Sequence, residues 1–139
     1  MTPVVVDCSV TMAWFFEDEV SPYTEAVLDA VGASSGATPA LWALEVANAL
    51  ATVLRKKTFA TERLAEVQGK LQRLHWELEP LDLARSLGPV LAVAQKHGLT
   101  SYDATYLEMA KRRELPLATL DKDLAAAAKR ERVKLWKAP

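Results

Sequence analysis

The chain has 139 residues, 50% of them hydrophobic and 25% charged, a balance that excludes disorder and fits one globular domain over 1–139. Its formal net charge of -1 excludes a uniformly basic, nucleic-acid-binding coat, although a local basic patch is compatible with this sum. The single cysteine excludes an internal disulfide, and no Cys and His spacing typical of zinc is present, so we expect a reducing, cytoplasmic setting and no membrane span.

Short strands alternate with helices in the first half of the predicted fold. In chain order we expect a strand over 4–6, helices over 9–16 and 22–32, an extended piece at 37–38 and a helix from 39 to about 54. Val4–Val6 is typical of a buried parallel strand, because β-branched side chains pack well in a sheet. The helix after Pro39 is apolar on most of its circumference, so we expect it to be buried between layers.

The second half continues the same alternation. In chain order we expect a helix over 61–74, an edge strand over 76–79, helices over 82–96 and 101–113, a strand over 115–119, a helix over 121–129 and a strand over 133–135. Gly88-Pro89 should kink the helix that contains it, and His97-Gly98 resembles a C-terminal cap. Repeated βα units predict an α/β fold with a parallel sheet covered by helices on both faces.

Four carboxylates stand where strands lead into helices or inside an apolar helix: Asp7, Glu45, Asp103 and Asp121. Side chains at the carboxyl ends of parallel strands converge in space although they are far apart in sequence. Carboxylate oxygens are the ligands that magnesium and manganese prefer. The pattern therefore predicts a Mg²⁺ or Mn²⁺ site, and phosphodiester chemistry on that metal is the leading hypothesis.

Each carboxylate also has a structural alternative. Asp7 can cap the helix that follows it, but a charge at the end of a buried strand is costly unless it is paired or metal-bound. Glu45 lies in the most apolar helix with Asn48 three residues on, so the pair either lines a polar cleft or forms an expensive buried patch. Asp103 and Asp121 each suit a helix start, and only their position and number together favour a site.

Several polar residues beside the carboxylates are weaker candidates. The hydroxyls of Ser9 and Thr119 can tune the acids or bind metal through water, but such residues usually cap helices. The basic residues Lys111 and Arg112 end a helix, where positive charge suits the dipole, and phosphate contact is their second interpretation. Cys8 is interpreted as a small buried hydrophobe.

Four segments together resemble the PIN-domain ribonucleases, and within them the VapC-type toxins of toxin-antitoxin pairs. The segments are Val4-Val5-Val6-Asp7-Cys8-Ser9, the stretch from Pro39 to Leu50, the stretch from Gly98 to Leu107, and the stretch from Leu115 to Leu124. By this resemblance Asp7, Glu45, Asp103 and Asp121 correspond to the acidic quartet of the family, with Ser9, Thr119 and Asp123 as supporting residues. The resemblance also implies a three-layer sandwich with a mainly parallel sheet of four to five strands.

The resemblance further implies endonucleolytic cleavage of RNA, often structured RNA such as transfer RNA, by water activated on Mg²⁺ or Mn²⁺. It implies a homodimer and a VapB-like antitoxin whose C-terminal segment occupies the groove near the acids. Two alternatives remain. Asp7-Cys8-Ser9-Val10-Thr11 resembles the start of haloacid-dehalogenase phosphohydrolases, although Ser9 stands where that motif has a second aspartate. The fold can also serve as an inactive binding module.

Overall fold

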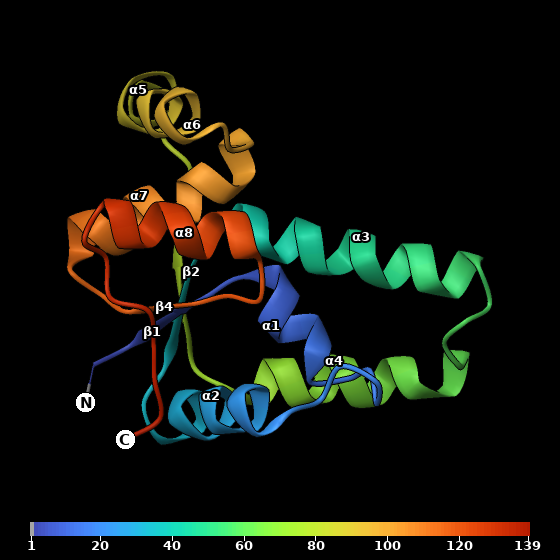
Figure 1. Ribbon diagram of the computed structural model, residues 1–139. Helices are drawn as coiled ribbons and strands as arrows, with labels where there is room; N and C mark the ends of the chain where they lie inside the picture. The colour runs from blue at the N-terminus through green and yellow to red at the C-terminus, as the bar shows by residue number, and fades with distance from the viewer. Residues whose placement is uncertain (1) are drawn as a thin grey trace.

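The computed structural model describes residues 2–139 as three layers, with a parallel sheet between two sets of helices (Figure 1). The sheet has four strands in the order β3-β2-β1-β4, namely Trp76–Glu79, Gly36–Pro39, Val4–Val6 and Leu117–Ala118. All three strand pairs are parallel. The three-layer α/β architecture predicted from the sequence is therefore confirmed.

The helices are α1 (Cys8–Ala13), α2 (Pro22–Ala33), α3 (Leu41–Arg55), α4 (Leu64–Arg73), α5 (Leu83–Arg85), α6 (Leu91–His97), α7 (Ser101–Arg113) and α8 (Lys122–Arg130). A 3₁₀ turn, η1 (Thr61–Arg63), precedes α4, and a π-helical segment, η2 (Ser86–Val90), joins α5 to α6. No helix within residues 2–139 is long and apolar enough to cross a bilayer.

Alternation along β1 divides the core between the two faces of the sheet. Val5 packs in the larger core, which contains buried side chains of α3, α7 and α8. Val4 and Val6 point to the other side and pack against Val27 and Val31 of α2. Because side chains of a strand alternate between faces, one short run of valines holds both helical layers to the sheet.

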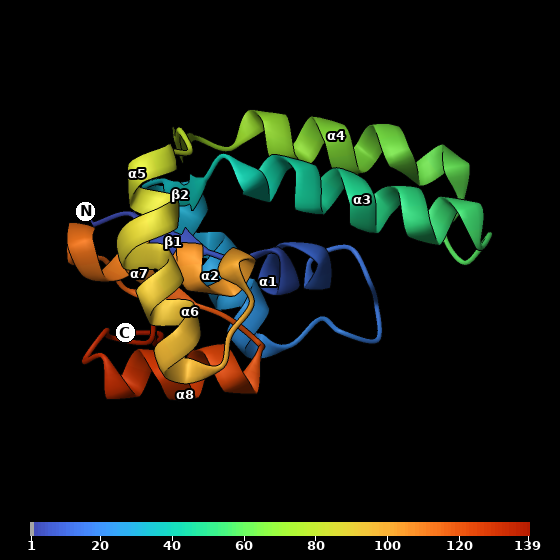
Figure 2. The same ribbon diagram turned by 90° about the horizontal axis from the view of Figure 1, so that it is seen from above.

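Helices α3 and α4 run roughly parallel, and both extend beyond the sheet (Figures 1 and 2). Only Trp42, Val46 and Leu50 of α3 are buried, and Leu44 is 76% exposed. The prediction that this helix lies buried between layers is therefore wrong. The helix buries one face only, since Ala43, Leu44, Ala47 and Ala51 on its other face are exposed.

Two further predictions need correction or refinement. The strand predicted over 133–135 is reduced to a single parallel bridge between Leu117 and Leu135, because β4 offers only a two-residue partner. Gly88-Pro89 does not break its helix but lies in the π-helical segment, where the wider turn accommodates the missing N–H of Pro89. Gly98, with φ of 64°, ends α6 as predicted.

At one end of the β2–β3 pair, a glycine lies opposite a tryptophan. Gly36 pairs with Trp76 in register, and the Trp76 ring stacks at 4.4 Å, centroid to centroid, on Trp42 of α3. A Cβ added at Gly36 would lie 2.2 Å from the Trp76 ring. The ring therefore requires a residue without a side chain at this position.

We expect Gly36→Ala to lower the free energy of unfolding by about 1–3 kcal/mol, the usual cost of overpacking a core. Chemical denaturation followed by tryptophan fluorescence measures this change. Gly32→Ala in α2 is the matched control, because nothing lies within 4 Å of its added Cβ, and the helix should gain up to about 1 kcal/mol. Equal behaviour of the two variants would contradict the steric argument.

Candidate active site

The four carboxylates come from the carboxyl edge of the sheet and the helices around it. Asp7 follows β1 directly, and Asp121 lies just beyond β4, the parallel neighbour of β1. Asp103 is in the first turn of α7, and Glu45 is in the second turn of α3. Asp121 and Asp7 both raise the pKa of Asp103, and Asp103 and Asp7 raise that of Glu45. The structure therefore brings the four charges into one electrostatic cluster.

Asp7 is the centre of a hydrogen-bond network that joins two strand ends. Its Oδ1 accepts bonds from the Ser9 hydroxyl (2.6 Å) and the Val10 amide (3.1 Å), and Oδ2 accepts a short bond from the Thr119 hydroxyl. The Asp121 amide in turn donates to Thr119 Oγ1 at 3.0 Å. Ser9 and Thr119, both named from the sequence, thus hold the loop after β4 against Asp7.

Capping and clustering are compatible here. Asp7 caps α1 through Val10, and Asp121 caps α8 by accepting the Leu124 amide at 2.8 Å. In both residues the helix cap uses a single oxygen, Oδ1, of the carboxylate. Each carboxylate has about four acceptor positions, so lone pairs are still free for another partner.

Burial and mutual repulsion raise the pKa of three site carboxyls. Burial is the main cause for Asp7, Glu45 and Asp103, followed by hydrogen bonds that partly offset it at Asp7 and Glu45. None of the charges acting on the pKa of Glu45 or Asp103 belongs to a lysine or arginine of residues 2–139. Within residues 2–139, no ion pair joins Asp7, Glu45, Asp103 or Asp121 to a basic side chain. A bound cation would relieve the repulsion between these carboxylates.

Tyr106 is a site residue that the sequence did not reveal. It is buried, 1% exposed, and its hydroxyl donates to Glu45 Oε1 at 2.5 Å, joining α7 to α3. Tyr106 is three residues after Asp103 on α7, and this spacing, which places both on one helix face, was the available signal. The bond fixes the direction in which Glu45 presents its second oxygen.

A second tie holds α3 beside Asp7. The Trp42 indole donates to Thr11 Oγ1 at 2.9 Å, and that hydroxyl donates to the Asp7 carbonyl oxygen at 2.9 Å. Trp42 precedes Glu45 by about one turn of α3. These two hydrogen bonds therefore fix the position of α3, and with it Glu45, relative to Asp7.

The weaker candidates fall in different places. Asn48 is exposed, which rules out the buried polar patch considered for Glu45 and Asn48. Asp123 is also exposed, in the first turn of α8, and its charge raises the pKa of Asp103. Burial, with Glu45 and Asp7 adding to it, raises the pKa of Cys8 to about 12. Its thiol is therefore no nucleophile at neutral pH.

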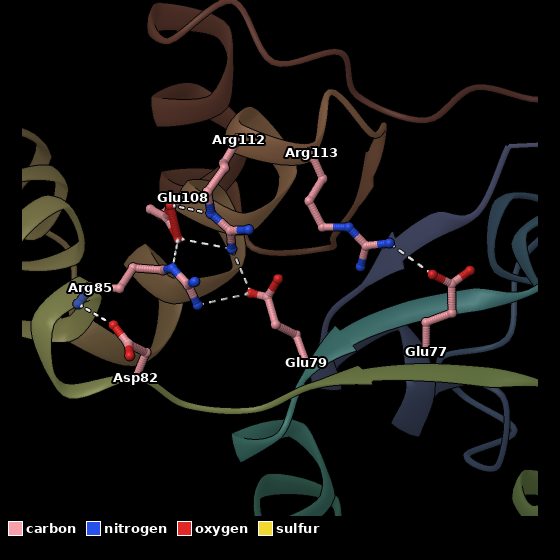
Figure 3. Close-up of polar contacts among 7 residues, drawn as sticks. All are labelled: Glu77, Glu79, Asp82, Arg85, Glu108, Arg112 and Arg113. Atoms are coloured by element: carbon pink, nitrogen blue, oxygen red, sulfur yellow. Dashed lines mark hydrogen bonds and ion pairs between the residues drawn. The ribbon is translucent and has the colours of Figure 1, made fainter.

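Lys111 and Arg112 are engaged in ion pairs within the fold. Figure 3 shows the Arg112 guanidinium directed at Glu79 and Glu108, at 2.5 and 2.9 Å. Hydrogen bonds to these two glutamates raise the pKa of Arg112. Lys111 pairs with Glu131 at 2.6 Å. Their predicted contact with RNA phosphate stays a prediction, and it would have to compete with these pairs.

The donor chemistry of the cluster fits a divalent metal, since every side chain is a hard oxygen ligand. As placed, however, no three His, Cys, Asp or Glu side chains within residues 2–139 lie close enough to hold one ion. Like charges without a counter-ion repel one another, and a cation would remove that repulsion. By their chemistry, Asp7, Glu45, Asp103 and Asp121 are the candidate ligands for such an ion.

Comparisons with known proteins show which family this chain and its fold are similar to. The family model described as PIN domain matches residues 4–130. Ribonuclease VapC3 of Pyrobaculum aerophilum is 32% identical over 122 residues, which are 88% of this chain and 92% of that protein. The crystal structure of PAE2754 from Pyrobaculum aerophilum has a TM-score of 0.66 at 26% identity, over 92% of this chain and 81% of that one. FitAcB from Neisseria gonorrhoeae shares the fold, with a TM-score of 0.63 at 22% identity over 97% of each chain.

We expect Tyr106→Phe to lower the free energy of unfolding by about 1–2 kcal/mol, because it removes a hydrogen bond to a half-buried carboxylate and retains the ring. Urea denaturation at neutral pH measures the difference. Tyr102→Phe is the matched control, since Tyr102 is 62% exposed on the same helix and should change stability by less than about 0.5 kcal/mol. A Tyr106 variant as stable as this control would show that the bond contributes nothing to the fold.

Proposed function

Because this chain belongs to the PIN-domain family and is a VapC-type member of it, we propose that it is an endoribonuclease that cleaves RNA with a divalent metal. The observation that carries the proposal is the cluster of Asp7, Glu45, Asp103 and Asp121. Burial and neighbouring carboxylates raise the pKa of Asp7, Glu45 and Asp103, and no ion pair joins any of the four to a basic side chain among the described residues. Structured RNA such as transfer RNA is the proposed substrate class.

Mg²⁺ or Mn²⁺ is the proposed cofactor. Bound at the four carboxylates, such an ion supplies an activated water and neutralises charge on the phosphate. The surrounding side chains position the carboxylates that would hold the ion. Ser9 and Thr119 fix the carboxylate of Asp7, and Tyr106 orients Glu45. Asn48, three residues after Glu45 on α3, and Asp123, whose charge raises the pKa of Asp103, are exposed and are proposed as supporting residues.

Two alternatives rank below this proposal. Membership of the PIN-domain family sets aside the haloacid-dehalogenase interpretation of the segment around Asp7. An inactive binding module would not need four clustered carboxylates, because like charges close together without a counter-ion destabilise a fold. An RNA substrate also fits the cytoplasmic location expected from the single free cysteine.

We expect purified protein to cleave a total RNA pool with Mg²⁺ or Mn²⁺ and not with chelator. Asp7→Asn and Glu45→Gln should each lower the cleavage rate by more than about 100-fold, because a ligand contributes at least as much as the groups supporting it. Asp29→Asn is the matched control, since exposed Asp29 lies with Thr2 and Val4 at the opposite edge of the sheet. Full activity of Asp7→Asn would refute the assignment.

A thermal readout separates metal binding from activity. Mn²⁺ should raise the melting temperature of the wild type and of Asp29→Asn, because binding to the folded state stabilises it. Asp7→Asn should show little or no such shift. Equal shifts in Asp7→Asn and Asp29→Asn would place the metal elsewhere.

A VapB-like antitoxin is the proposed protein partner, since an uncompensated carboxylate cluster attracts a positively charged segment. We also propose a homodimer. Its support is the exposed leucine face of α5, η2 and α6, made of Leu83, Leu87 and Leu91, which are 75, 65 and 44% exposed and spaced four residues apart. Arg85, on the same segment, is directed away into pairs with Glu79 and Glu108. A face of exposed leucines can pack against the same face of a second copy across a twofold axis.

We expect Leu87→Glu to convert a dimer into a monomer, because the substitution places two like charges across the proposed axis. Light scattering coupled to size-exclusion chromatography measures the mass. Val20→Glu, which changes an exposed apolar residue before α2, is the control and should keep the wild-type mass. A dimer that survives Leu87→Glu would place the interface on another surface.

A further inference from the structure

Positive charge is concentrated where α8 ends and the chain runs on to the C-terminus. Five of the nine residues over 129–137 are basic, and only Glu131 is acidic. Its carboxylate is already engaged by other helices, through Lys111 at 2.6 Å, Lys96 at 2.9 Å and His97 at 2.6 Å. The hydrogen bond from Lys111, followed by those from Lys96 and His97, lowers the pKa of Glu131 to about 2. The segment therefore has a surplus of positive charge.

Two hollows in the protein surface bring four of these basic side chains together. Lys129, Lys134 and Lys137 line the first hollow. Arg132 and Lys134 line the second, together with Lys111. Lys134 borders both, so the two hollows adjoin. We call Lys129, Arg132, Lys134 and Lys137 the basic surface. All four are exposed, and within residues 2–139 none of them forms an ion pair with a carboxylate.

Few acidic side chains oppose the basic surface. Among the described residues, Glu114 and Glu131 line the second hollow and no carboxylate lines the first. Because Glu131 is paired with Lys96 and Lys111, only Glu114 is left to offset four cations. The basic surface is therefore locally positive in a chain whose net charge is -1.

Structural roles account for only part of this charge. Lys129 lies in the last turn of α8, where the helix dipole favours a cation. Arg132, Lys134 and Lys137 come after the helix and have no such role. Arg132 has a φ of 60°, a left-handed conformation that glycine adopts without strain and other residues do not. Exposed cations that the fold does not need are typical of a surface that attracts a polyanion.

The carboxylate cluster leaves the affinity for RNA to another surface. Carboxylates repel phosphate, whereas lysine and arginine supply most of the sequence-independent affinity for nucleic acid. Thr2 and Pro116, which precede β1 and β4, line the second hollow, so the basic surface lies at the amino edge of the sheet. Helix α8 starts after Asp121 and has nine residues, so roughly 14 Å of helix separate the cluster from the basic surface. One RNA chain can extend from the cluster to this surface.

We propose that the basic surface binds the phosphate backbone of RNA away from the carboxylate cluster, and so holds a part of the substrate that is not cut. The proposal rests on the proposed ribonuclease function for the identity of the polyanion. Phosphate contacts carry no sequence information. The surface therefore adds affinity and orientation for any RNA long enough to reach it.

The test measures the affinity of a fluorescently labelled single-stranded RNA, longer than α8, by anisotropy at a series of salt concentrations. Chelator is present so that the RNA stays intact. In the double variant Lys134→Gln and Lys137→Gln, the slope of log affinity against log salt should become shallower by about 1.4, because each phosphate contact with a single strand contributes about 0.7. Lys56→Gln with Lys57→Gln is the matched control. It removes two exposed lysines just after α3, far from the C-terminus in Figures 1 and 2, and should keep the wild-type slope.

A second pair of variants separates binding from folding. Arg132→Gly should keep or raise the melting temperature, because glycine relieves the left-handed strain, while the salt slope becomes shallower by about 0.7. Lys57→Gly is its control, since Lys57 has a φ of 58° and is also an exposed cation just after a helix. Its melting temperature should respond in the same direction, and its salt slope should not change.

The basic surface is overturned if its variants keep the wild-type slope, if the variants after α3 lose as much, or if the wild type binds no RNA. An unchanged slope for RNA with weakened binding of poly-glutamate would assign the surface to an acidic protein segment instead. Metal-dependent cleavage of the same RNA by the wild type is measured alongside. Cleavage with unchanged slopes rejects the surface alone, whereas the expected slopes without cleavage of any RNA reject the ribonuclease function and retain the surface.

Discussion

The carboxylate of Asp7, 4% exposed at the end of the central strand β1, is the constraint on which the rest of the site depends. Burial raises its pKa, and bonds from Ser9, Thr119 and Val10 act in the opposite direction. Those three donors come from α1 and from the loop after β4, so the charge can stay buried only while both strand ends are in register. Site and sheet are therefore stabilised by the same contacts.

Helix α7 connects this site to the outer edge of the sheet. Its first turns carry Asp103 and Tyr106, which face the acidic cluster. Its last turns carry Glu108 and Arg112, which pair with Glu79 at the end of β3 and with Arg85 on the segment that follows (Figure 3). Buried Glu108, 7% exposed, shares its charge with two arginines. Helix α7 thus carries Asp103, which forms no ion pair among the described residues, near its start. Near its end it carries a network of ion-paired side chains.

Two surfaces of the molecule differ in their charge. At the carboxyl edge, the negative charges of Asp7, Asp103 and Asp121 are concentrated. Over α5, η2 and α6, exposed leucines lie where the arginine has turned inward. A metal ion and a protein partner require different surfaces, and this chain of net charge -1 offers both because of where its charged and apolar side chains lie.

The sequence by itself determined the elements and the approach of the carboxylates. Valine runs, N-caps and turn residues act over a few neighbours, and parallel strands bring their carboxyl ends to one edge, so Asp7 and Asp121 had to approach each other. Only the tertiary structure decided that α3 projects from the sheet, that Tyr106 bonds Glu45 from 61 residues away, and that Arg112 pairs with Glu79 from 33 residues away. Such contacts depend on how whole elements pack, and no local pattern encodes which distant side chain will lie opposite.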